Sequence, residues 1–423
     1  MQQILDLHIH SKYSRACSPQ LTLENIDSVC RVKGVDIVAT GDFTYPAWFK
    51  DIKNKLIETK TDSGLYKLKT AEDNKIKFIL STEVALIYKD NNRTRRIHLV
   101  IHAPNLRTAQ ELNNYLDKDY NIRSDGRPIL GMTAVDLVKL CLTIDKKILI
   151  YPAHAWTPWF AIFGSKSGFD KIEECFHEYV KNIFAIETGL SSDPGMNWRL
   201  SALDKLTILS NSDAHSLFNI AREANVFEME KITYDEIYDI IKNKKISNNN
   251  PGIKYTIEFY PEEGMYHYDG HRDCGVSFTP EETKKHKGIC PVCKKFLTIG
   301  VMNRVEELAD RPLGYHPSGA APYRKIVELD KIIAQALGVK SRHSKKVQSE
   351  YNNLIKQSGN EFNILLNINL EKLAGITNAI IIKGIKRARE GDLIIKPGFD
   401  GEYGTIKIFK NKEKQNNKQS SLF

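Results

Sequence analysis

Side chains that bind transition metals follow short apolar runs throughout the first half of the chain. His8 and His10 stand two positions apart near the N-terminus. In a β-strand such residues point to the same side, so one ion could contact both. Imidazole and carboxylate together are the ligand set of Zn, Mn or Fe rather than of calcium. Five more such residues stand at the ends of apolar runs: Glu83, His98, His154, Asp213 and His215.

Taken singly, any one of these histidines would more often be an ordinary core or surface residue. Seven residues of coordinating type at the ends of expected strands are harder to explain in that way. A βα-barrel gathers its chemistry at the C-terminal ends of its strands. The pattern therefore predicts a hydrolytic enzyme with more than one metal ion.

Short runs rich in β-branched residues alternate with amphipathic stretches from residue 1 to about 230. Repeated strand-then-helix units indicate an α/β fold with a parallel sheet or a barrel. Strands are expected at residues 35–39, 97–101, 148–151, 183–186 and 207–209, and helices at 134–141 and 171–180.

The second half of the chain is expected to form smaller units. Residues 231–250 end in a polar run before Pro251 and have the composition of a linker. A helix is expected from Pro322 to Gly338, another at 379–389, and a Gly-rich hairpin at 397–404. The predicted domains are 1–230, a small domain at 251–330, a helical region at 331–410 and a flexible tail at 411–423.

Length and composition exclude several classes of protein. At 423 residues the chain is too long for one ordinary core. No apolar run approaches the roughly 20 residues of a membrane span. The N-terminus carries Asp6 and His8 instead of a basic and apolar signal. We therefore expect a cytoplasmic protein with no membrane partner.

The positive charge lies in the second half. Residues 1–230 hold 29 Lys and Arg against 29 Asp and Glu, while residues 231–423 hold 32 against 23. A basic half joined to a metal-binding half favours a polyanionic substrate, held by one and cut by the other. A lysine-rich surface that only increases solubility is the alternative.

Four residues in the middle of the chain have the spacing of a zinc site. His271 and Cys274 form one pair with two residues between them, and Cys290 and Cys293 form another. Three thiolates and one imidazole are a common ligand set of structural Zn. Four protein ligands leave no open position for water, so the site is expected to be structural. His286 is the alternative to His271 as the fourth ligand.

The order and spacing of the metal-binding residues resemble the polymerase and histidinol phosphatase (PHP) family of phosphoesterases. The resemblance covers about residues 1–230 and implies a distorted βα-barrel with up to three divalent ions (Zn, Mn or Mg). It implies that one ion contacts His8, His10, Glu83 and Asp213, a second Glu83, His98 and His154, and a third Asp42 and His215. Phe43 follows Asp42 where the family has histidine. Two ions are therefore the safer expectation.

Basic and aromatic residues near these positions are candidates for substrate binding. Arg95 and Arg96 precede His98 and could hold a phosphate. Trp156 and Trp159 follow His154 and could stack on an extruded base. A solvated basic turn and tryptophans that fill the rim of the barrel are equally compatible alternatives.

Further segments extend the resemblance over almost the whole chain. They are residues 266–274, 290–293, 304–311 and 397–404, and together with a PHP domain they are similar to the endonuclease Q family of archaeal and bacterial DNA repair enzymes. The resemblance implies hydrolysis of the phosphodiester 5′ of deaminated bases (uracil, hypoxanthine, xanthine) and of abasic sites. Its partners would be double- and single-stranded DNA, and its location the nucleoid. Metal-activated water would attack the phosphorus, with Glu83, Asp42 and His215 as catalytic residues.

The last residues, with Gln419, Leu422 and Phe423, resemble the start of a sliding-clamp-binding peptide, and a polar tail with an apolar end is the alternative.

Two other functions compete with the endonuclease. One is a small-molecule phosphatase, which needs neither a zinc unit nor a basic half. The other is a non-catalytic DNA- or clamp-binding protein.

Overall fold

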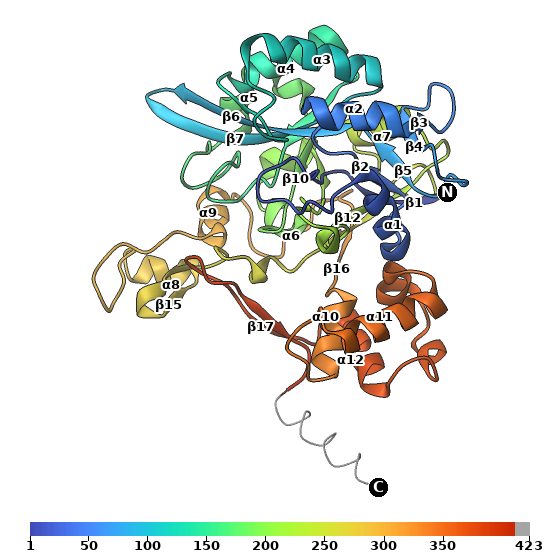
Figure 1. The fold of residues 1–423 in the computed structure, drawn as a ribbon. Coiled ribbons are helices and arrows are strands. Elements are labelled where there is room, and N and C mark those ends of the chain that lie inside the picture. Colours follow the sequence, from blue (N-terminus) through green and yellow to red (C-terminus); the bar gives the residue numbers. More distant parts are fainter. Residues whose placement is uncertain (411–423) are drawn as a thin grey trace.

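The computed structural model describes residues 1–410, which form three regions (Figure 1). The largest is an α/β unit built on an eight-stranded mixed sheet with the order β16-β13-β12-β1-β2-β5-β4-β3. The central strand β1 (Gln2–Asp6) pairs in parallel with β2 (Ile37–Ala39) and antiparallel with β12 (Ala224–Glu228). The other strands are β3 (Leu56–Glu58), β4 (Leu65–Leu68), β5 (Lys77–Ile79), β13 (Gly252–Glu258) and β16 (Tyr323–Lys325).

A four-stranded sheet with the order β8-β6-β7-β9 lies beside it. Its centre is a long antiparallel hairpin of β6 (Ser81–Asp90) and β7 (Arg93–His102), flanked by β8 (Ile129–Leu130) and β9 (Leu149–Pro152). A third sheet pairs β10 (Ala185–Glu187) with β11 (Thr207–Leu209) in parallel. The α/β class is confirmed, whereas the named sheets of residues 1–410 are separate and do not form one continuous ring.

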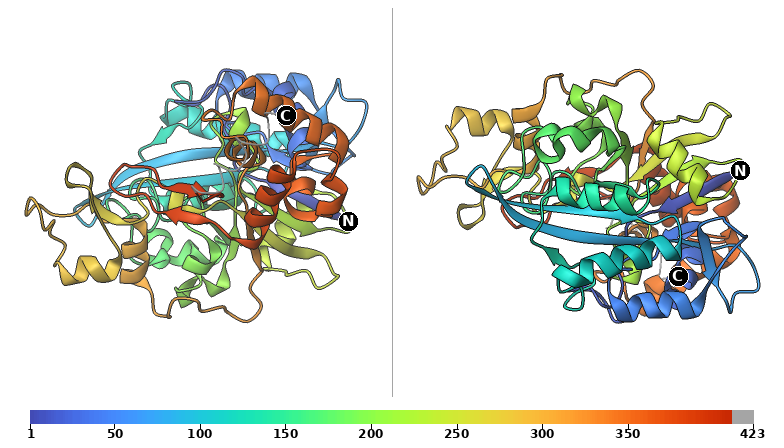
Figure 2. Two further views of the ribbon diagram at one scale, coloured as in Figure 1. Left: turned by 90° about the horizontal axis from the view of Figure 1, so that it is seen from below. Right: turned by 90° about the horizontal axis from the view of Figure 1, so that it is seen from above.

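Amphipathic helices cover these sheets, and α3 and α4 lie along the β6–β7 ribbon in the view from above (Figure 2). Helix α1 shows how the sequence sets such an element. Thr22 caps its N-terminus, Ile26 and Cys30 are fully buried, and Gly34 ends it at φ 93°, a left-handed conformation that suits glycine. The helices of this unit are α1 (Leu23–Lys33), α2 (Pro46–Lys55), α3 (Leu106–Asp119), α4 (Ala134–Ile144), α5 (Ile172–Phe176), α6 (Pro194–Asn197) and α7 (Tyr234–Lys242).

The second region projects from the α/β unit and contains the cysteine-rich segment (Figure 1). It consists of β14 (Asp269–His271), β15 (Val276–Phe278), α8 (Pro280–Lys285) and α9 (Val301–Leu308). A hairpin of β17 (Ile394–Lys396) and β18 (Thr405–Lys407) reaches it from the C-terminal helices. The Tyr268 amide donates to the Gly398 carbonyl at 3.0 Å, so the turn between β17 and β18 is joined to this region.

The third region is a small bundle of α10 (Leu329–Ala336), α11 (Lys345–Ser358) and α12 (Ala379–Glu390). Ile332, Leu354 and Ile385 are fully buried between its helices. Gly384 allows the close approach of α10, because a Cβ atom there would lie 2.8 Å from Cγ2 of Ile332. The predicted helix at 379–389 is confirmed.

The structure corrects two predicted boundaries. The expected linker at 231–250 contains α7, whose residues Tyr234, Ile237 and Ile241 are buried in the core. The expected small domain at 251–330 contains β13 and β16, which extend the eight-stranded sheet. The helix expected from Pro322 spans only α10, because residues 323–325 pair with β13 as a strand. Sequence composition could not indicate this pairing, which joins strands far apart along the chain.

No helix among residues 1–410 has the length and apolar character that a membrane crossing requires.

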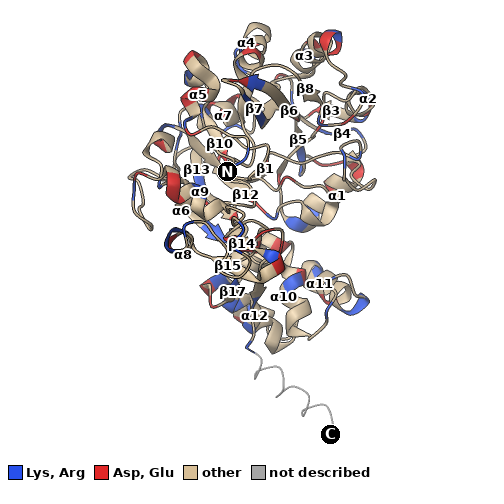
Figure 3. Ribbon diagram, turned by 90° about the vertical axis from the view of Figure 1, so that its left-hand side faces the viewer, with Lys and Arg blue, Asp and Glu red and all other residues tan. Residues whose placement is uncertain are grey.

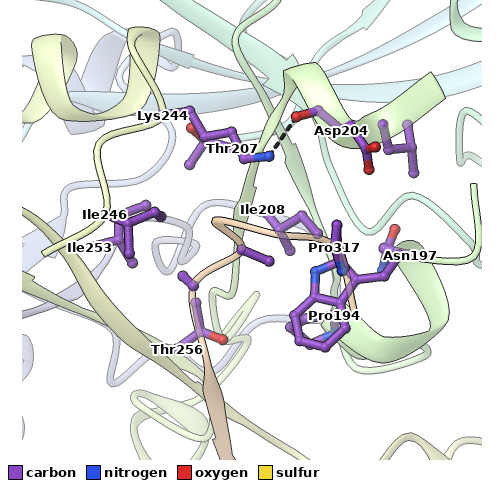
Figure 4. A pocket seen from close by; sticks show the side chains of 14 residues that line it. Pro194, Asn197, Asp204, Thr207, Ile208, Lys244, Ile246, Ile253, Thr256 and Pro317 are labelled. Carbon is purple, nitrogen blue, oxygen red and sulfur yellow. Dashed lines mark hydrogen bonds between the residues drawn. The ribbon is translucent and has the colours of Figure 1, made fainter. Parts of the chain in front are cut away.

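A pocket opens between β11, β13 and residues 317–321, and Lys244 donates to the carbonyl of Asp204 at its edge (Figure 4). None of the predicted metal ligands lines this pocket, so it is separate from the site described below.

Candidate metal centre

Two groups of coordinating side chains meet inside the α/β unit. In each group, one potential ligand atom from every residue lies within 4.8 Å of the others. The first group is His8, His10, Glu83 and Asp213, and the second is Glu83, His98 and His154. Glu83 belongs to both groups, which is the arrangement expected of a carboxylate that bridges two ions.

Strand ends place these residues. The His10 amide donates to the Ala214 carbonyl at 3.1 Å, and the Asp213 amide donates to the His8 carbonyl at 2.9 Å. These bonds join segments that lie about 200 residues apart in the chain. Glu83 and His98 lie on adjacent strands of the β6–β7 hairpin.

Two of the coordinating residues adopt left-handed backbone conformations, at φ 29° for His154 and 45° for Asp213. Such conformations are costly for residues other than glycine and concentrate at functional sites. Gly189 lies so close to His154 that a Cβ atom would be 2.5 Å from the Cβ of the histidine. The fold therefore holds His154 in this geometry.

The first group contains buried polar atoms that lack a hydrogen-bond partner among the described residues. They are Nε2 of His8, Nε2 of His10 and Oδ1 of Asp213, which make no well-directed hydrogen bond although Nε2 of His10 lies 3.2 Å from Oδ1 of Asp213. An unpaired polar atom in the interior costs free energy, and a divalent cation bound by all three would remove that cost. The donor set of nitrogen and carboxylate oxygen suits Zn, Mn or Fe. The residues of this group therefore fit a metal ion.

The other ring nitrogen of each N-terminal histidine is held by a carboxylate. Nδ1 of His8 lies 3.0 Å from Oε2 of Glu187, and Nδ1 of His10 lies 2.9 Å from Oδ1 of Asp42. Such contacts fix the tautomer and the orientation of metal-binding imidazoles. Burial alone would lower the pKa of His8, but the carboxylates around it, first that of Glu187, raise it to about 9.

The two histidines of the second group contact the same carboxylate and shift in opposite directions: the contact with Glu83 outweighs burial and raises the pKa of His154, whereas the pKa of His98 falls. Nδ1 of His98 lies 2.9 Å from Glu83, and Nε2 of His154 lies 3.1 Å from the same Oε1 atom. Burial lowers the pKa of His98 to about 4, although Glu83 opposes the shift. His98 is therefore neutral at physiological pH, which is the state in which imidazole binds a metal.

Asp42 and His215, predicted as ligands of a third ion, join neither group. Asp42 is fully buried, and it accepts bonds from His10 and, at 2.6 Å, from both the amide and the hydroxyl of Ser11. His215 is partly exposed, and its ring centroid lies 4.6 Å from that of His10. Phe43 is buried in the core. Among residues 1–410, coordinating atoms form only two groups at this site.

The two predicted phosphate-binding arginines lie outside the ligand groups. Arg95 is 8% exposed, and its guanidinium donates to the Gly168 carbonyl and packs 3.9 Å from the ring centroid of Phe169. These contacts tie it to the loop after β9, and its role in phosphate binding remains a prediction. Arg96 is half-buried and lines a hollow with residues 164–168.

The two predicted stacking residues differ from each other. Trp156 is 1% exposed, and its indole nitrogen donates to Asn197 at 2.8 Å. It fills the core and cannot stack on a base in this conformation, so that prediction is wrong. Trp159 is 39% exposed, with its ring 5.4 Å from that of Tyr266 in the cysteine-rich region. Its role in stacking remains a prediction.

Sequence reasoning missed two residues of the site. Glu187 ends β10 directly after an apolar run, so the signal that indicated Glu83 was present and was not used. Arg127 lies in an irregular loop before β8, and its Nη1 atom lies 3.0 Å from Oε2 of Glu83. Nothing in its local sequence distinguishes it from other loop arginines.

The four predicted zinc ligands converge in the second region. His271, Cys274, Cys290 and Cys293 each place a ligand atom within 4.8 Å of the others. Both ring nitrogens of His271 lie within 3.9 Å of Sγ of Cys293. His286, the alternative ligand, instead stacks on Phe278 with ring centroids 4.7 Å apart. The geometry fits one tetrahedral ion with three sulfur ligands and one nitrogen ligand.

An α/β fold with two linked groups of imidazole and carboxylate defines a metal-dependent phosphoesterase. Over the whole chain the structure is similar to the crystal structure of a lesion-specific endonuclease from Pyrococcus furiosus, with a TM-score of 0.84 and 31% identity over 99% of each chain. It is also similar to a complex of endonuclease Q with a 27-mer duplex that has an abasic lesion at the active site, with a TM-score of 0.83 and 31% identity over 97% of each chain. The chain belongs to the endonuclease Q family.

Sequence comparison adds two relatives. The protein MJ0043 of Methanocaldococcus jannaschii is 35% identical over 260 residues, which are 60% of this chain but only 31% of that protein. The protein YqxK of Bacillus subtilis is 26% identical over 95% of this chain and 98% of its own length. The family described as the MJ0043 C-terminal domain matches residues 328–392, which contain α10, α11 and α12.

Proposed function

We propose that the protein is a metal-dependent DNA repair endonuclease. Its substrates would be duplexes with deaminated bases (uracil, hypoxanthine, xanthine) or abasic sites, cut at the phosphodiester on the 5′ side of the lesion. The supporting observation is the pair of ligand groups that share Glu83, in a chain similar over its whole length to an endonuclease Q that holds an abasic duplex at its active site. A small phosphomonoester would need neither the cysteine-rich region nor the C-terminal bundle.

Divalent ions bound at the two groups would activate a water and neutralise charge on the phosphate. Zn, Mn and Mg are the candidates, with a structural Zn in the second region. Glu187 and Asp42 orient the imidazoles of His8 and His10 through their Nδ1 atoms. We assign protonation of the leaving oxygen to His215, whose side chain is 29% exposed, and not to Asp42, whose oxygens accept bonds from within the protein.

The finer architectural and partner assignments belong to the same proposal. The three sheets around the ligand groups would correspond to the distorted barrel of PHP phosphoesterases. Residues 331–410 hold 14 Lys and Arg against 7 Asp and Glu, which favours contact with DNA. Basic segments recur along α8 and the C-terminal helices, with acidic ones between them (Figure 3). The clamp-binding motif at Gln419, Leu422 and Phe423 lies outside the described residues.

A denaturing gel tests the function. A labelled duplex with one uracil, hypoxanthine or abasic site is incubated with Mg²⁺ or Mn²⁺ beside an undamaged duplex. We expect one nick 5′ of the lesion and none in the control. Hydrolysis of p-nitrophenyl phosphate without any nick would favour the phosphatase, and a mobility shift without a nick would favour a binding protein.

A further inference from the structure

Arg127 is held against the metal centre by the backbone on both sides of it. The Gly126 amide donates to the Tyr13 carbonyl at 3.0 Å, and the Ala85 amide donates to the Pro128 carbonyl at 3.0 Å. Tyr13 and Ala85 follow the ligands His10 and Glu83 by three and two positions, respectively. The loop that carries Arg127 is therefore fixed to the same two segments as the ligands.

The glycine before this arginine makes the approach possible. A Cβ atom on Gly126 would lie 2.6 Å from Oδ2 of Asp42 and 2.5 Å from Oγ of Ser14. Any larger residue would push the loop away from the ligands. The amide of Arg127 donates to Oδ1 of Asp125 at 2.9 Å, which completes the turn.

The guanidinium of Arg127 has one partner inside the site and an open side. Its Nη1 atom lies 3.0 Å from Oε2 of Glu83, the carboxylate shared by both ligand groups. The side chain of Glu83 is fully buried, whereas that of Arg127 is 22% exposed. A guanidinium has five N–H donors in a planar fork that matches two oxygens of a phosphate. The contact with Glu83 leaves most of those donors for another anion.

We propose that Arg127 binds a non-bridging oxygen of the scissile phosphate, a role that rests on the proposed endonuclease function. Arg95 is tied to the loop after β9, and Arg96 shares a hollow with that loop. Arg127 contacts the carboxylate on which the two ligand groups meet, where the reacting phosphate must lie.

A purely structural role is the competing explanation, in which Arg127 only neutralises Glu83. The two roles differ in whether Arg127 senses the charge of one particular phosphate. Replacing that phosphate by a neutral methylphosphonate removes its charge and leaves the protein intact. If Arg127 contacts this phosphate, the loss of affinity from removing the arginine and the loss from removing the phosphate charge are not additive.

The experiment measures the binding of two duplexes, each with one uracil. One has an ordinary phosphodiester 5′ of the uracil, and the other has a methylphosphonate at that position. Fluorescence anisotropy is recorded in Ca²⁺, and a gel checks that the duplex stays intact. We expect the wild type to bind the methylphosphonate duplex about tenfold more weakly, the value of one charge-assisted contact. Arg127→Ala should bind the normal duplex about tenfold more weakly and lose nothing further with methylphosphonate.

Arg123→Ala is the matched control, because Arg123 is exposed and paired with Asp117, and this variant should lose affinity with methylphosphonate as the wild type does. Arg127→Gln removes the charge at a similar side-chain length and provides the cycle if the alanine variant fails to fold. Additive losses in Arg127→Ala or Arg127→Gln would overturn the role of Arg127. In that case, nicking of the uracil duplex by the wild type in Mg²⁺ or Mn²⁺ would still support the endonuclease, whereas its absence on every lesion would overturn the proposed function itself.

Discussion

The metal centre and the cysteine cluster (His271, Cys274, Cys290 and Cys293) are built in opposite ways. The ligands of the metal centre come from positions 8 to 213, and they lie within a large core that includes Leu5, Leu99 and Ile101, all fully buried. The ligands of the cysteine cluster lie between positions 271 and 293. Around them, Val276, Cys290 and Leu297 form a small buried apolar cluster, with Cys274, Phe278 and Cys293 packed against it.

This difference predicts what a bound metal ion would contribute to folding in each region. A large core can hold ligands in place without an ion, so metal at the centre should serve the reaction. A core of three residues cannot offset the conformational entropy of its segment, so metal there should supply folding free energy. Loss of ligands should therefore have different consequences in the two regions.

The largest expected effect is on activity at the metal centre. His8→Ala removes a ligand and should lower the rate of nicking by about 10³-fold or more, because metal ions provide most of the stabilisation of the transition state. Circular dichroism and thermal unfolding should show that the fold persists. His177→Asn, which changes an exposed histidine outside both groups, is the control and should keep full activity. Global unfolding of His8→Ala would contradict a preformed centre.

The next effect is local unfolding of the cysteine cluster. His271→Ala should lose one zinc per chain by metal analysis, because three ligands hold the ion poorly. Hydrogen exchange should then rise in residues 269–298 and stay low in β1, β6 and β7. His286→Ala should retain the ion, since the ring of His286 stacks on Phe278 and is not part of the ligand group. The opposite pattern for the two histidines would reverse the assignment of the fourth ligand.

A smaller effect, a loss of stability, should appear where α9 of the cysteine-rich region contacts the α/β unit. Arg304 in α9 is 7% exposed, and it donates to the carbonyls of Phe163 at 3.0 Å and Phe169 at 3.1 Å, in the loop that follows His154. Arg304→Ala leaves these carbonyls without a partner and should cost about 2–4 kcal/mol of stability. Urea unfolding measures the loss, and hydrogen exchange should rise in residues 159–170.

Lys166→Ala is a suitable control for the arginine, because Lys166 lies in the same loop and lines the hollow beside it. Equal losses in both variants would mean that Arg304 does not join the regions. A loss confined to Arg304→Ala would make the loop after His154 the connection between the cysteine cluster and the metal centre.

The smallest effect is a dependence on pH in the α/β unit. Burial lowers the pKa of His102 to about 3, against 6.5 in the unfolded chain. Below pH 6.5 the unfolded state binds a proton that the native state does not, so stability falls as the pH falls. The slope is about 1.4 kcal/mol per pH unit for one group, between pH 6.5 and 3. Urea unfolding of the wild type and His102→Gln at pH 7, 6 and 5 should show a shallower slope in the variant, and equal slopes would exclude His102.

Local spacing determined the parts of the site that the sequence predicted. His8 and His10 share one side of a strand end because side chains alternate along a strand. His271 lies near Cys274, and Cys290 near Cys293, because each pair closes a short loop. Local patterns also predicted the α/β class and the helix at 379–389. The class follows from the alternation of short apolar runs with amphipathic stretches, and the helix follows from its own periodicity.

The tertiary structure decided what depends on long-range contacts. Arg95 and Trp156 stand beside ligands in the sequence, yet their side chains are tied to Gly168 and Asn197 within the fold. Arg127 lies far from the ligands in the sequence and contacts Glu83 in space. The pairing of β13 with β12 likewise moved the predicted boundary at residue 250, because it joins residues 252–258 to the large sheet. Hydrogen bonds between distant segments choose these partners, and neither composition nor periodicity carries that information.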